Sequence, residues 1–410
     1  MAPRLSIVIP ALNEEDAIGA TLTRCLEARP HITKHGGVDS VEILVVSDGS
    51  TDATERIACG FPEVHVAAFD RNRGYGAAIR CGFDLATGDL LGFLDADGTC
   101  DPRIFAELCA AIERAPADVA LGSRMGAGSE MPLVRTVGNL LFAWLLGILA
   151  RSTVKDTASG MRVIRRTALV DLYPLPDGLH FTPAMSARAL LEGKLRLVEV
   201  PMPYAERVGR SKLSVLRDGG RFLRCIVQAA VTFRPARPLL LAAAALALVA
   251  LAVGAFPVLH WLRDGTVEDW MIYRTLFASL LAVASALVVC AAAVADRIAV
   301  LTHQRPLARS GVTALLGRLF TRRSRWIGGG LLFGLALAVT WPGIVQYATT
   351  GHVLMHWSRA LVGSLLTTLV VALVSTTFLL NMLELIQAQR EPGRPAHPPD
   401  RVRPARGTAG

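Results

Sequence analysis

The sequence predicts an α/β domain with a mostly parallel sheet, followed by a helical membrane domain. In the first half, a β-branched apolar run, a polar turn and a helical pattern follow one another repeatedly, an alternation typical of parallel sheets. In the second half, long apolar stretches raise the hydrophobic content of the chain to 52% and its mean hydropathy to +0.42. Stretches of this kind are typical of helices that cross a bilayer.

The first two units of strand and turn lie near the start of the chain. The run Leu5–Pro10 predicts a strand that ends in a proline-containing turn, and the segment Asn13–Asp16 fits the start of a helix. The run Val41–Ser47 predicts a second strand, and Asp48 begins the capping stretch after it. Because ligands bind beyond the carboxyl ends of parallel strands, these acidic turns are expected to meet in one cleft.

A further predicted strand, Leu90–Leu94, ends at the acidic triplet formed by Asp95, Ala96 and Asp97. The turn Arg71–Gly76 and an alanine-rich helical pattern come before it. Two carboxylates one residue apart at a strand end can share a divalent cation, and such a cation can hold a diphosphate. For the pair taken alone, a solvated turn is the alternative.

The apolar excess is concentrated after Arg237. A helix needs roughly 20 apolar residues to cross a bilayer. The predicted spans are Leu239–Leu259, Leu276–Val294, Ile327–Tyr347 and Ala360–Leu380. Met1–Pro10 leads directly into the first strand, so no signal peptide is expected.

The charges between the spans predict their direction. Arg234 and Arg237 precede the first span, and six arginines lie within 303–325, so both flanks are expected in the cytoplasm. The connection 263–269 is net acidic, and 349–358 carries no lysine or arginine. The prediction is therefore a multi-pass protein of the inner (cell) membrane, with the first domain and both termini in the cytoplasm.

Two further segments are expected to lie on the membrane as interfacial helices. The apolar stretch 133–151 is short and contains arginines near its ends, and 213–236 mixes arginines with large apolar residues. A core helix or a further crossing is the alternative for the first, and a linker helix for the second. The predicted division is a catalytic domain over 1–212, an interfacial helix over 213–236, a membrane domain over 237–388 and a disordered basic tail over 389–410.

Cysteine spacing and the distribution of charge limit the cellular compartment and the classes of partner that we expect. The seven cysteines are scattered without Cys-x-x-Cys spacing, which fits a reducing compartment and indicates neither zinc nor a disulfide framework. The pI of about 9.6 reflects arginines at membrane flanks and in the tail. This distribution favours the positive-inside pattern over phosphate-backbone binding, so no nucleic-acid partner is expected.

Seven motifs follow one another along the first domain. They are Ile9–Glu15, Ser47–Asp52, Asn72–Ala77, Leu94–Asp97, Gly122–Arg124, Asp156–Arg162, and Val198–Pro201 followed by Arg207–Lys212. In this order they resemble glycosyltransferase family 2, and within it the polyprenyl-phosphate glycosyltransferases typified by dolichol-phosphate mannose synthase. The resemblance covers residues 5 to about 215 and implies a type A glycosyltransferase fold, which is Rossmann-like with a mostly parallel sheet.

The resemblance implies a nucleotide-sugar donor at the strand ends. Glu15 and Asp48 would hydrogen-bond its ribose and base, with helix capping as the alternative for each. Asp95 and Asp97 would be the metal ligands that position Mg²⁺ or Mn²⁺ on the diphosphate. The implied nucleotide-binding residues are Pro10, Ala11, Asn13, Glu15, Asp48, Asn72, Gly74, Asp95 and Ala96.

Cations are needed as well, because the leaving group and the implied acceptor are both anions. In the family, the loop that corresponds to 207–212 folds over the donor and meets the lipid phosphate, and Gly209 would give it flexibility. The implied catalytic residues are Asp97, Arg124, Arg162, Arg207 and Lys212, and those for the lipid phosphate are Arg124, Arg207, Ser211 and Lys212. For a single arginine, a solvated surface position is the alternative.

The implied acceptor is polyprenyl phosphate. A phosphate monoester has its second pKa near about 6 and is largely a dianion at neutral pH, so it can attack without a general base. The expected outcome is inversion at the sugar carbon. An acidic residue is expected within 178–185 by this resemblance, but the segment carries His180, Thr182 and Ala184. His180 is a candidate substitute for that acid, and packing of its ring is the alternative.

Three other functions are weighed. A processive polysaccharide synthase would need a cytoplasmic Glu-Asp base and a Gln-x-x-Arg-Trp motif, whereas Glu268 and Asp269 are expected across the membrane. Transfer to a lipid hydroxyl would need a base that the sequence does not single out. A transporter or flippase would need ionisable residues inside the spans, and the predicted spans contain no Asp, Glu, Lys or Arg.

The sequence therefore predicts a membrane-bound, metal-dependent enzyme that transfers one sugar from a donor of the GDP-mannose or UDP-glucose type to polyprenyl phosphate. The partners expected are the donor, the lipid and the membrane, and a homo-oligomer is compatible with the sequence.

Overall fold

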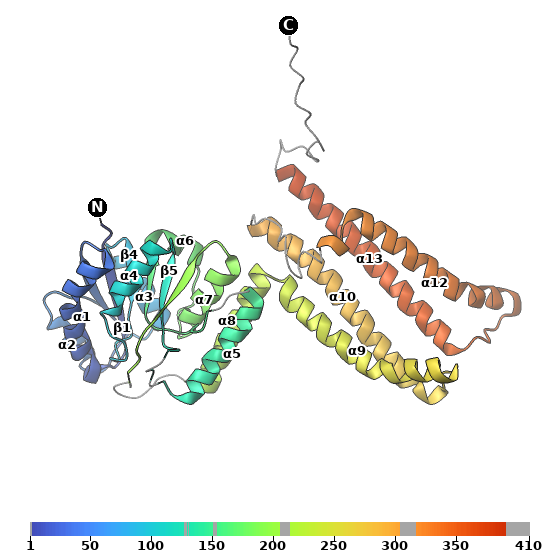
Figure 1. Ribbon diagram of the computed structural model, residues 1–410, viewed down its shortest axis with the longest axis horizontal. Coiled ribbons are helices and arrows are strands. Elements are labelled where there is room, and N and C mark those ends of the chain that lie inside the picture. Colours follow the sequence, from blue (N-terminus) through green and yellow to red (C-terminus); the bar gives the residue numbers. More distant parts are fainter. Residues whose placement is uncertain are drawn as a thin grey trace, which may run out of the picture. The chain divides into compact units, whose positions relative to one another are not determined.

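The chain folds into two compact units, Met1–Arg234 and Pro235–Gly410 (Figure 1). The computed structural model describes residues 2–126, 129, 131–150, 154–205, 214–303 and 317–390. The first unit contains a sheet with helices on both faces, and the second consists of long helices.

A single sheet of seven strands organises the first unit, in the order β3-β2-β1-β4-β6-β5-β7. The pairs β1–β2, β2–β3, β1–β4 and β5–β7 are parallel, and β6 is antiparallel to both β4 and β5. The predicted mostly parallel sheet is confirmed. The strands are β1 (Leu5–Ala11), β2 (Val41–Ser47), β3 (His65–Ala68), β4 (Leu90–Phe93), β5 (Val119–Ser123), β6 (Arg162–Arg165) and β7 (Leu197–Pro201).

Helices cover both faces of the sheet because the central strands are apolar on both sides. In β1, Ile7 and Ile9 join one buried cluster and Val8 joins another. The first cluster includes residues of α1 (Glu15–Gly36), α2 (Thr54–Cys59) and α4 (Ile104–Arg114). The second includes residues of α3 (Tyr75–Leu85), α6 (Leu169–Leu172) and α7 (Phe181–Glu192).

Two more helices, α5 (Leu133–Ala150) and α8 (Val215–Phe233), pack on α7 through a third cluster. Phe142 and Phe222 meet edge to face with their ring centroids 5.9 Å apart. The other sides of α5 and α8 expose large apolar side chains, among them Trp144, which is 63% exposed, and Leu223, which is 46% exposed. An exposed apolar surface of this kind is typical of a face that meets another apolar phase.

The position of α5 in the chain shows that it does not cross a membrane, although it is long and apolar enough to do so. It follows β5 and precedes β6, and these two strands pair in the same sheet. One crossing between them would put two hydrogen-bonded strands on opposite sides of a bilayer.

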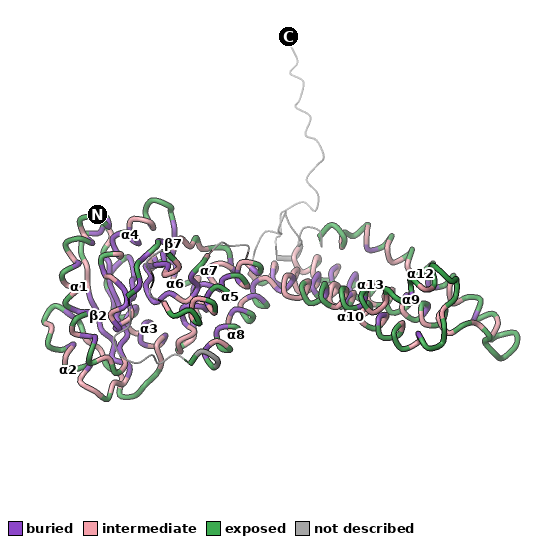
Figure 2. The backbone as a smooth tube through the Cα atoms, turned by 60° about the horizontal axis from the view of Figure 1, so that its bottom comes forward, coloured by how far each residue is buried: buried purple, intermediate pink, exposed green. Residues whose placement is uncertain are grey.

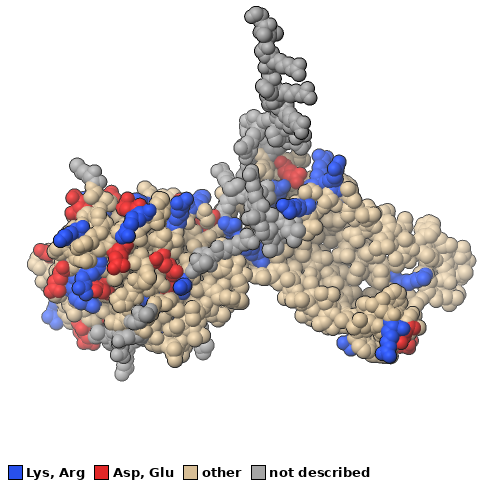
Figure 3. All heavy atoms as spheres, in the orientation of Figure 1, with Lys and Arg blue, Asp and Glu red and all other residues tan. Residues whose placement is uncertain are grey.

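The second unit contains α9 (Ala236–Asp264), α10 (Ile272–His303), α12 (Arg322–Thr350) and α13 (Trp357–Arg390). Each of these helices includes one of the predicted spans and is long and apolar enough to cross a membrane. Much of their surface is exposed (Figure 2), and on the face seen in Figure 3 their sides are almost free of charged side chains. This is the surface expected of helices that face lipid.

Charged side chains connect three of these helices beyond the ends of the predicted spans. The enclosed Arg325 side chain of α12 donates from Nη2 to Asn381 Oδ1 at 3.0 Å and to Glu384 Oε1 at 3.3 Å, both in α13. Arg297 of α10 approaches the same glutamate at 3.7 Å. These ion pairs tie helix ends together and give no sign of a charged pathway along the described spans.

The close approach of α3 to β1 generates a prediction. A Cβ at Gly82 would collide with the side chain of Val8. We expect Gly82→Ala to lower the free energy of unfolding by about 1–3 kcal/mol, because overpacking outweighs a helix-propensity gain of about 1 kcal/mol. Pulse proteolysis in urea, applied to the full chain in detergent, measures this change.

Gly19 in α1 provides the matched control. A Cβ there would lie 3.5 Å from Ile57, which is an ordinary contact, so Gly19→Ala should stabilise the protein by about 0.5–1 kcal/mol. If both substitutions stabilised the protein equally, the tight contact between α3 and β1 would be wrong.

Candidate active site

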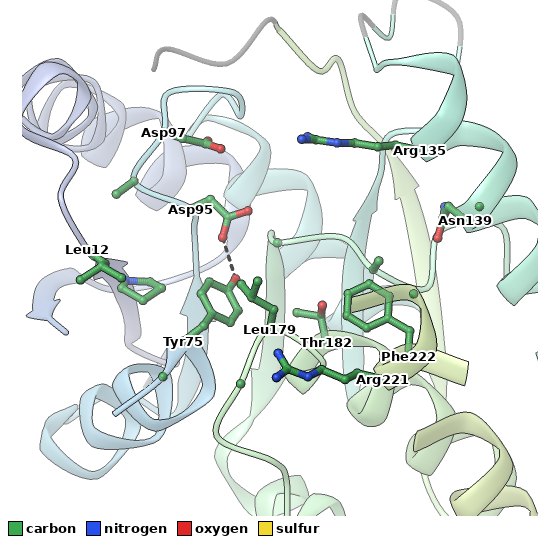
Figure 4. A pocket seen from close by; sticks show the side chains of 18 of the residues that line it. Leu12, Tyr75, Asp95, Asp97, Arg135, Asn139, Leu179, Thr182, Arg221 and Phe222 are labelled. Carbon is green, nitrogen blue, oxygen red and sulfur yellow. Dashed lines mark hydrogen bonds between the residues drawn. The ribbon is translucent and has the colours of Figure 1, made fainter. Parts of the chain in front are cut away.

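The carboxyl ends of the parallel strands line one pocket with a volume of about 550 Å³. The chain places β2 and β3 on one side of β1 and β4 on the other, and such a switch point is where open α/β sheets bind ligands. The lining residues lie between Pro10 and Phe222 and come from the ends of β1, β2, β4 and β5 and from α5, α7 and α8 (Figure 4). The predicted meeting of the acidic turns is therefore found.

After β2, Asp48 holds the loop that forms one side of the pocket. Its Oδ1 accepts hydrogen bonds from the N–H of Arg73 at 2.7 Å and of Gly74 at 3.1 Å, and its Oδ2 accepts from Gly74 at 3.0 Å. Burial raises the pKa of Asp48, and these backbone donors partly offset the increase. Gly74 has a φ of 110°, and a Cβ on it would collide with the carbonyl of Asp177.

Both carboxylate oxygens of Asp48 thus accept hydrogen bonds from the protein's own backbone. Asn72 and Gly74, which the sequence assigns to nucleotide binding, line the pocket together with Asp48. The loop that this carboxylate shapes is therefore the surface offered to a ligand at this place.

After β1, the predicted residues divide into two groups. Pro10 and Ala11 line the pocket, with Leu12 and Glu14 beside them. Asn13 and Glu15 lie outside the lining. The Oδ1 of Asn13 accepts from the N–H of Thr51 at 2.8 Å, and the Oε2 of Glu15 accepts from the N–H of Ala53 at 2.9 Å. These two side chains therefore join the turn after β1 to the turn after β2. Glu15 does not cap its own helix α1, which begins at Glu15 with Glu14 before it.

After β4, Asp95 and Asp97 lie on the same side of the pocket (Figure 4). The Tyr75 hydroxyl donates to Asp95 Oδ1 at 2.6 Å. Desolvation and the charge of Asp95 raise the pKa of Tyr75 well above its usual value, so the hydroxyl keeps its proton. Thr99 Oγ1 donates to Asp97 Oδ1 at 2.7 Å. A Cβ at Gly160 would collide with the Asp95 carboxylate.

The two aspartates fit a divalent cation that arrives with a diphosphate. Carboxylate oxygens are the hard ligands that Mg²⁺ and Mn²⁺ prefer. Among the described residues, no group of three or more His, Cys, Asp or Glu could hold a metal ion. The part of the chain that the structure describes therefore offers one or two carboxylates, and phosphate oxygens and water would complete the coordination.

After β5, Arg124 forms a buried ion pair with Asp156. Its Nε lies 2.7 Å from Oδ2 and its Nη2 lies 2.8 Å from Oδ1. Burial alone would lower the pKa of Arg124 and raise that of Asp156, but each charge stabilises the other and reverses the shift. Arg124 lines the pocket, with Cζ 5.4 Å from the centroid of the Tyr204 ring. Two of its nitrogens are therefore already engaged by the protein.

Arg162, in contrast, does not reach the pocket. Its side chain is fully buried, with Nε donating to Ser159 O at 3.1 Å and Nη2 to Thr157 O at 2.9 Å. Burial lowers its pKa to about 10. The expected catalytic contact of Arg162 with a phosphate is therefore not supported in this structure. Arg162 is the first residue of β6, and the loop just before this strand encloses its guanidinium.

A wall of α5 and α8 completes the pocket and brings in residues that the motifs missed. Arg135 and Arg221 point toward the interior (Figure 4). Arg221 also pairs with Asp218 at 3.1 Å. The sequence signal for these residues was present but general: arginines at helical spacing in amphipathic segments. The residues of this wall are Val134, Arg135, Gly138, Asn139, Phe142, Arg217, Gly219, Arg221 and Phe222.

Other predicted positions lie away from this site or outside the described residues. His180 precedes α7 and is not part of the lining, whereas Thr182 is. Burial and then the charge of Arg221 lower the pKa of His180. The loop residues expected to close over the donor, Arg207, Gly209, Arg210, Ser211 and Lys212, lie outside the described residues.

Comparison with known proteins places the chain in a family. The family model of glycosyl transferase family 2 matches residues 6–172. The low-salt glycan biosynthesis hexosyltransferase Agl6 of Haloferax volcanii is 33% identical over 55% of this chain, and the chain spans only 53% of that protein.

Two other relatives are matched over most of their length. Dolichyl-phosphate hexose transferase of Haloferax volcanii is 30% identical over 55% of this chain and 92% of that protein. Polyprenol monophosphomannose synthase of Mycolicibacterium smegmatis is 34% identical over 52% of this chain and 81% of that protein. With its type A sheet and strand-end pocket, this chain is a glycosyltransferase that belongs to glycosyl transferase family 2.

Proposed function

We propose that the protein transfers one sugar from a nucleotide-sugar to polyprenyl phosphate at the cytoplasmic surface of the membrane. The observation that carries this proposal is a single pocket in which acidic strand ends face a wall made by α5 and α8. The outer sides of these helices expose large apolar residues. Two relatives whose names include dolichyl phosphate and polyprenol support the same acceptor class.

The donor lies along the strand ends in this proposal. Pro10, Ala11, Asn72, Gly74 and Ala96 line the side of the pocket that would take the nucleotide. A donor of the GDP-mannose or UDP-glucose type fits there, with its diphosphate toward the two aspartates. Tyr75 fixes the orientation of the Asp95 carboxylate through its 2.6 Å hydrogen bond. When bound by Asp95 and Asp97, Mg²⁺ or Mn²⁺ would neutralise the departing diphosphate.

The acceptor phosphate lies against the basic side of the pocket. Arg135, Arg217 and Arg221 come from the two helices, and Arg124 can offer the N–H groups of its guanidinium that do not bond to Asp156. Arg207, Ser211 and Lys212 remain candidates from the sequence. Because the phosphate is itself the nucleophile, no protein base is required, and a single displacement would invert the sugar carbon.

The membrane arrangement follows from the charges. The arginine-rich flanks at 234–237 and 303–325 favour the cytoplasmic side, where the nucleotide-sugar pool lies. In this arrangement α9, α10, α12 and α13 cross the membrane, and α5 and α8 lie at its surface with their apolar sides toward lipid.

The direct test incubates the purified full chain with radiolabelled nucleotide-sugars and polyprenyl phosphate, followed by extraction of the lipid. We expect label in a lipid that mild acid hydrolyses, because a phosphate monoester leaves the sugar carbon far more readily than an alcohol does. A labelled lipid stable to mild acid would indicate a hydroxyl acceptor, and labelled polymer would indicate a processive enzyme.

The aspartate pair generates a second prediction. Asp97→Ala should lower the transfer rate about a hundredfold or more, because the cation supplies several kcal/mol of charge stabilisation. A chelator should have a similar effect, reversed by Mn²⁺ or Mg²⁺. Asp101→Asn is the matched control, since Asp101 pairs with Arg103 near the same turn but does not line the pocket. Full activity of Asp97→Ala would remove the basis for the metal assignment.

The basic wall generates a third prediction. Arg135→Gln and Arg217→Gln should each raise the KM for polyprenyl phosphate about tenfold and leave the KM for the donor nearly unchanged, because each loses a charged hydrogen bond to the acceptor. Arg224→Gln on α8 is the control, as Arg224 is exposed and does not line the pocket. A selective rise in the donor KM would place these arginines at the diphosphate instead.

A further inference from the structure

A buried polar network connects α5 to the pocket, and Asn139 is its centre. Asn139 is only 6% exposed. Its Nδ2 donates to Asp156 Oδ1 and to the carbonyl of Lys155, both at 3.1 Å. Its Oδ1 accepts from the N–H and the hydroxyl of Thr157, again at 3.1 Å. One side chain thus holds three consecutive residues of the loop before β6.

The same loop is held from its other sides. Glu199 of β7 accepts from the N–H of Lys155 and of Asp156 at 2.8–3.0 Å. Ser186 of α7 donates to the carbonyl of Thr157 at 2.9 Å. Asp156 is therefore fixed in place, and Arg124 is fixed with it through two side-chain bonds and one backbone bond to the same carboxylate.

We infer that Asn139 is a positioning residue that sets the place of Arg124 in the pocket and couples it to α5. The inference rests on the proposed function, in which α5 lies at the membrane surface and Arg124 meets the acceptor phosphate. A displacement of α5 would strain the bonds of Asn139 to the loop 155–157, and through Asp156 it would disturb the position of Arg124. Misplacement of a binding group by about 1 Å can cost about a hundredfold in rate.

The alternative is a purely structural role, in which Asn139 only stabilises the fold. An asparagine at this place would then matter for unfolding and not for the rate of the folded enzyme. Asn139→Asp separates the two roles because a protonated carboxyl keeps much of the amide's pattern: it can donate its one proton to Asp156 and accept from Thr157, and it loses only the bond to the carbonyl of Lys155. An ionised carboxyl cannot donate, and it repels Asp156.

The sign of the pH effect follows from this difference. Two carboxyl groups that share a site cannot both ionise easily, so the pKa of the new acid should lie above the ordinary value of about 3.9. Below that pKa the variant should work almost as the unmodified enzyme does. As the pH rises through it, the ratio of variant to unmodified rate should fall about tenfold to a hundredfold. The charged and titratable groups around the site are Arg124, Asp156, Arg162 and Glu199, with Arg135 on α5 and Arg217, Asp218 and Arg221 on α8.

The experiment measures the transfer rate of the full chain in membranes from mildly acidic to mildly alkaline pH, always as the ratio to the unmodified enzyme. Ionisation of the acceptor phosphate changes both rates by the same factor, so it does not affect their ratio. Thr136→Asp is the control, because it adds the same charge to the same helix at a residue that does not line the pocket. The double variant Asn139→Asp with Asp156→Asn keeps one acid and one amide, so its rate ratio should lose the pH dependence.

The midpoint of urea unfolding at each pH is the second readout. A pH-dependent rate ratio confined to Asn139→Asp supports the inference. A ratio that does not change with pH, a similar fall in Thr136→Asp, or a change in the midpoint without a change in rate would overturn it. If the unmodified protein transferred no sugar to polyprenyl phosphate, the proposed function would fail and this inference about the reaction would fail with it. The midpoint of the single and double variants would then report only whether residues 139 and 156 are coupled.

Discussion

β1 and β4 pair in parallel, and this pairing brings the turn after β1 beside the aspartates that follow β4. The register aligns Val8 with Phe93, so Pro10 to Leu12 continue along the same edge as Asp95 to Asp97. Helix α1 strengthens the arrangement, because Thr21 donates to the carbonyl of Ala96 at 3.1 Å and Arg24 donates to that of Gly98 at 3.0 Å. The nucleotide side and the metal side of the proposed site are thus fixed by one strand pair and one helix.

Buried charge shapes the rest of the pocket. Asp48, Asp97 and Asp156 are each less than a tenth exposed, and burial of an unpaired carboxylate would be costly. Backbone N–H groups, a threonine hydroxyl and Arg124 respectively satisfy these three side chains. Each bond also fixes a loop that lines the pocket. The polar groups that a substrate would meet are therefore oriented before it arrives, which is the condition for electrostatic catalysis without reorganisation.

The sequence predicted correctly those features that depend on residues close to one another in the chain. Apolar runs and the turns after them gave the strand ends, and hence Asp48, Asp95 and Asp97, because strand periodicity and turn chemistry depend on near neighbours. It did not predict which way the side chains of the motif residues point in the folded domain. Arg162 and Arg124 belong to adjacent motifs of one family, yet β6 lies between β4 and β5 and buries Arg162, and Arg124 forms a bidentate ion pair with Asp156. Tyr75 and Asn139 were not singled out, because their roles arise from contacts with Asp95 and Asp156, residues distant in the chain. The loop 207–212 stays a prediction.

The position of α5 between the pocket and its exposed apolar face indicates how a lipid acceptor would reach the site. Because β5 and β6 pair in one sheet, α5 begins and ends on the same side of any membrane, and in the proposed arrangement its exposed apolar face lies along the membrane surface. Its opposite face carries Arg135 and Asn139 into the pocket. An acceptor that reaches the pocket past this helix would keep its isoprenoid chain in hydrocarbon while its phosphate met the arginines. The enzyme would then have no need to extract the lipid, and the cost of exposing a long apolar chain to water would not arise.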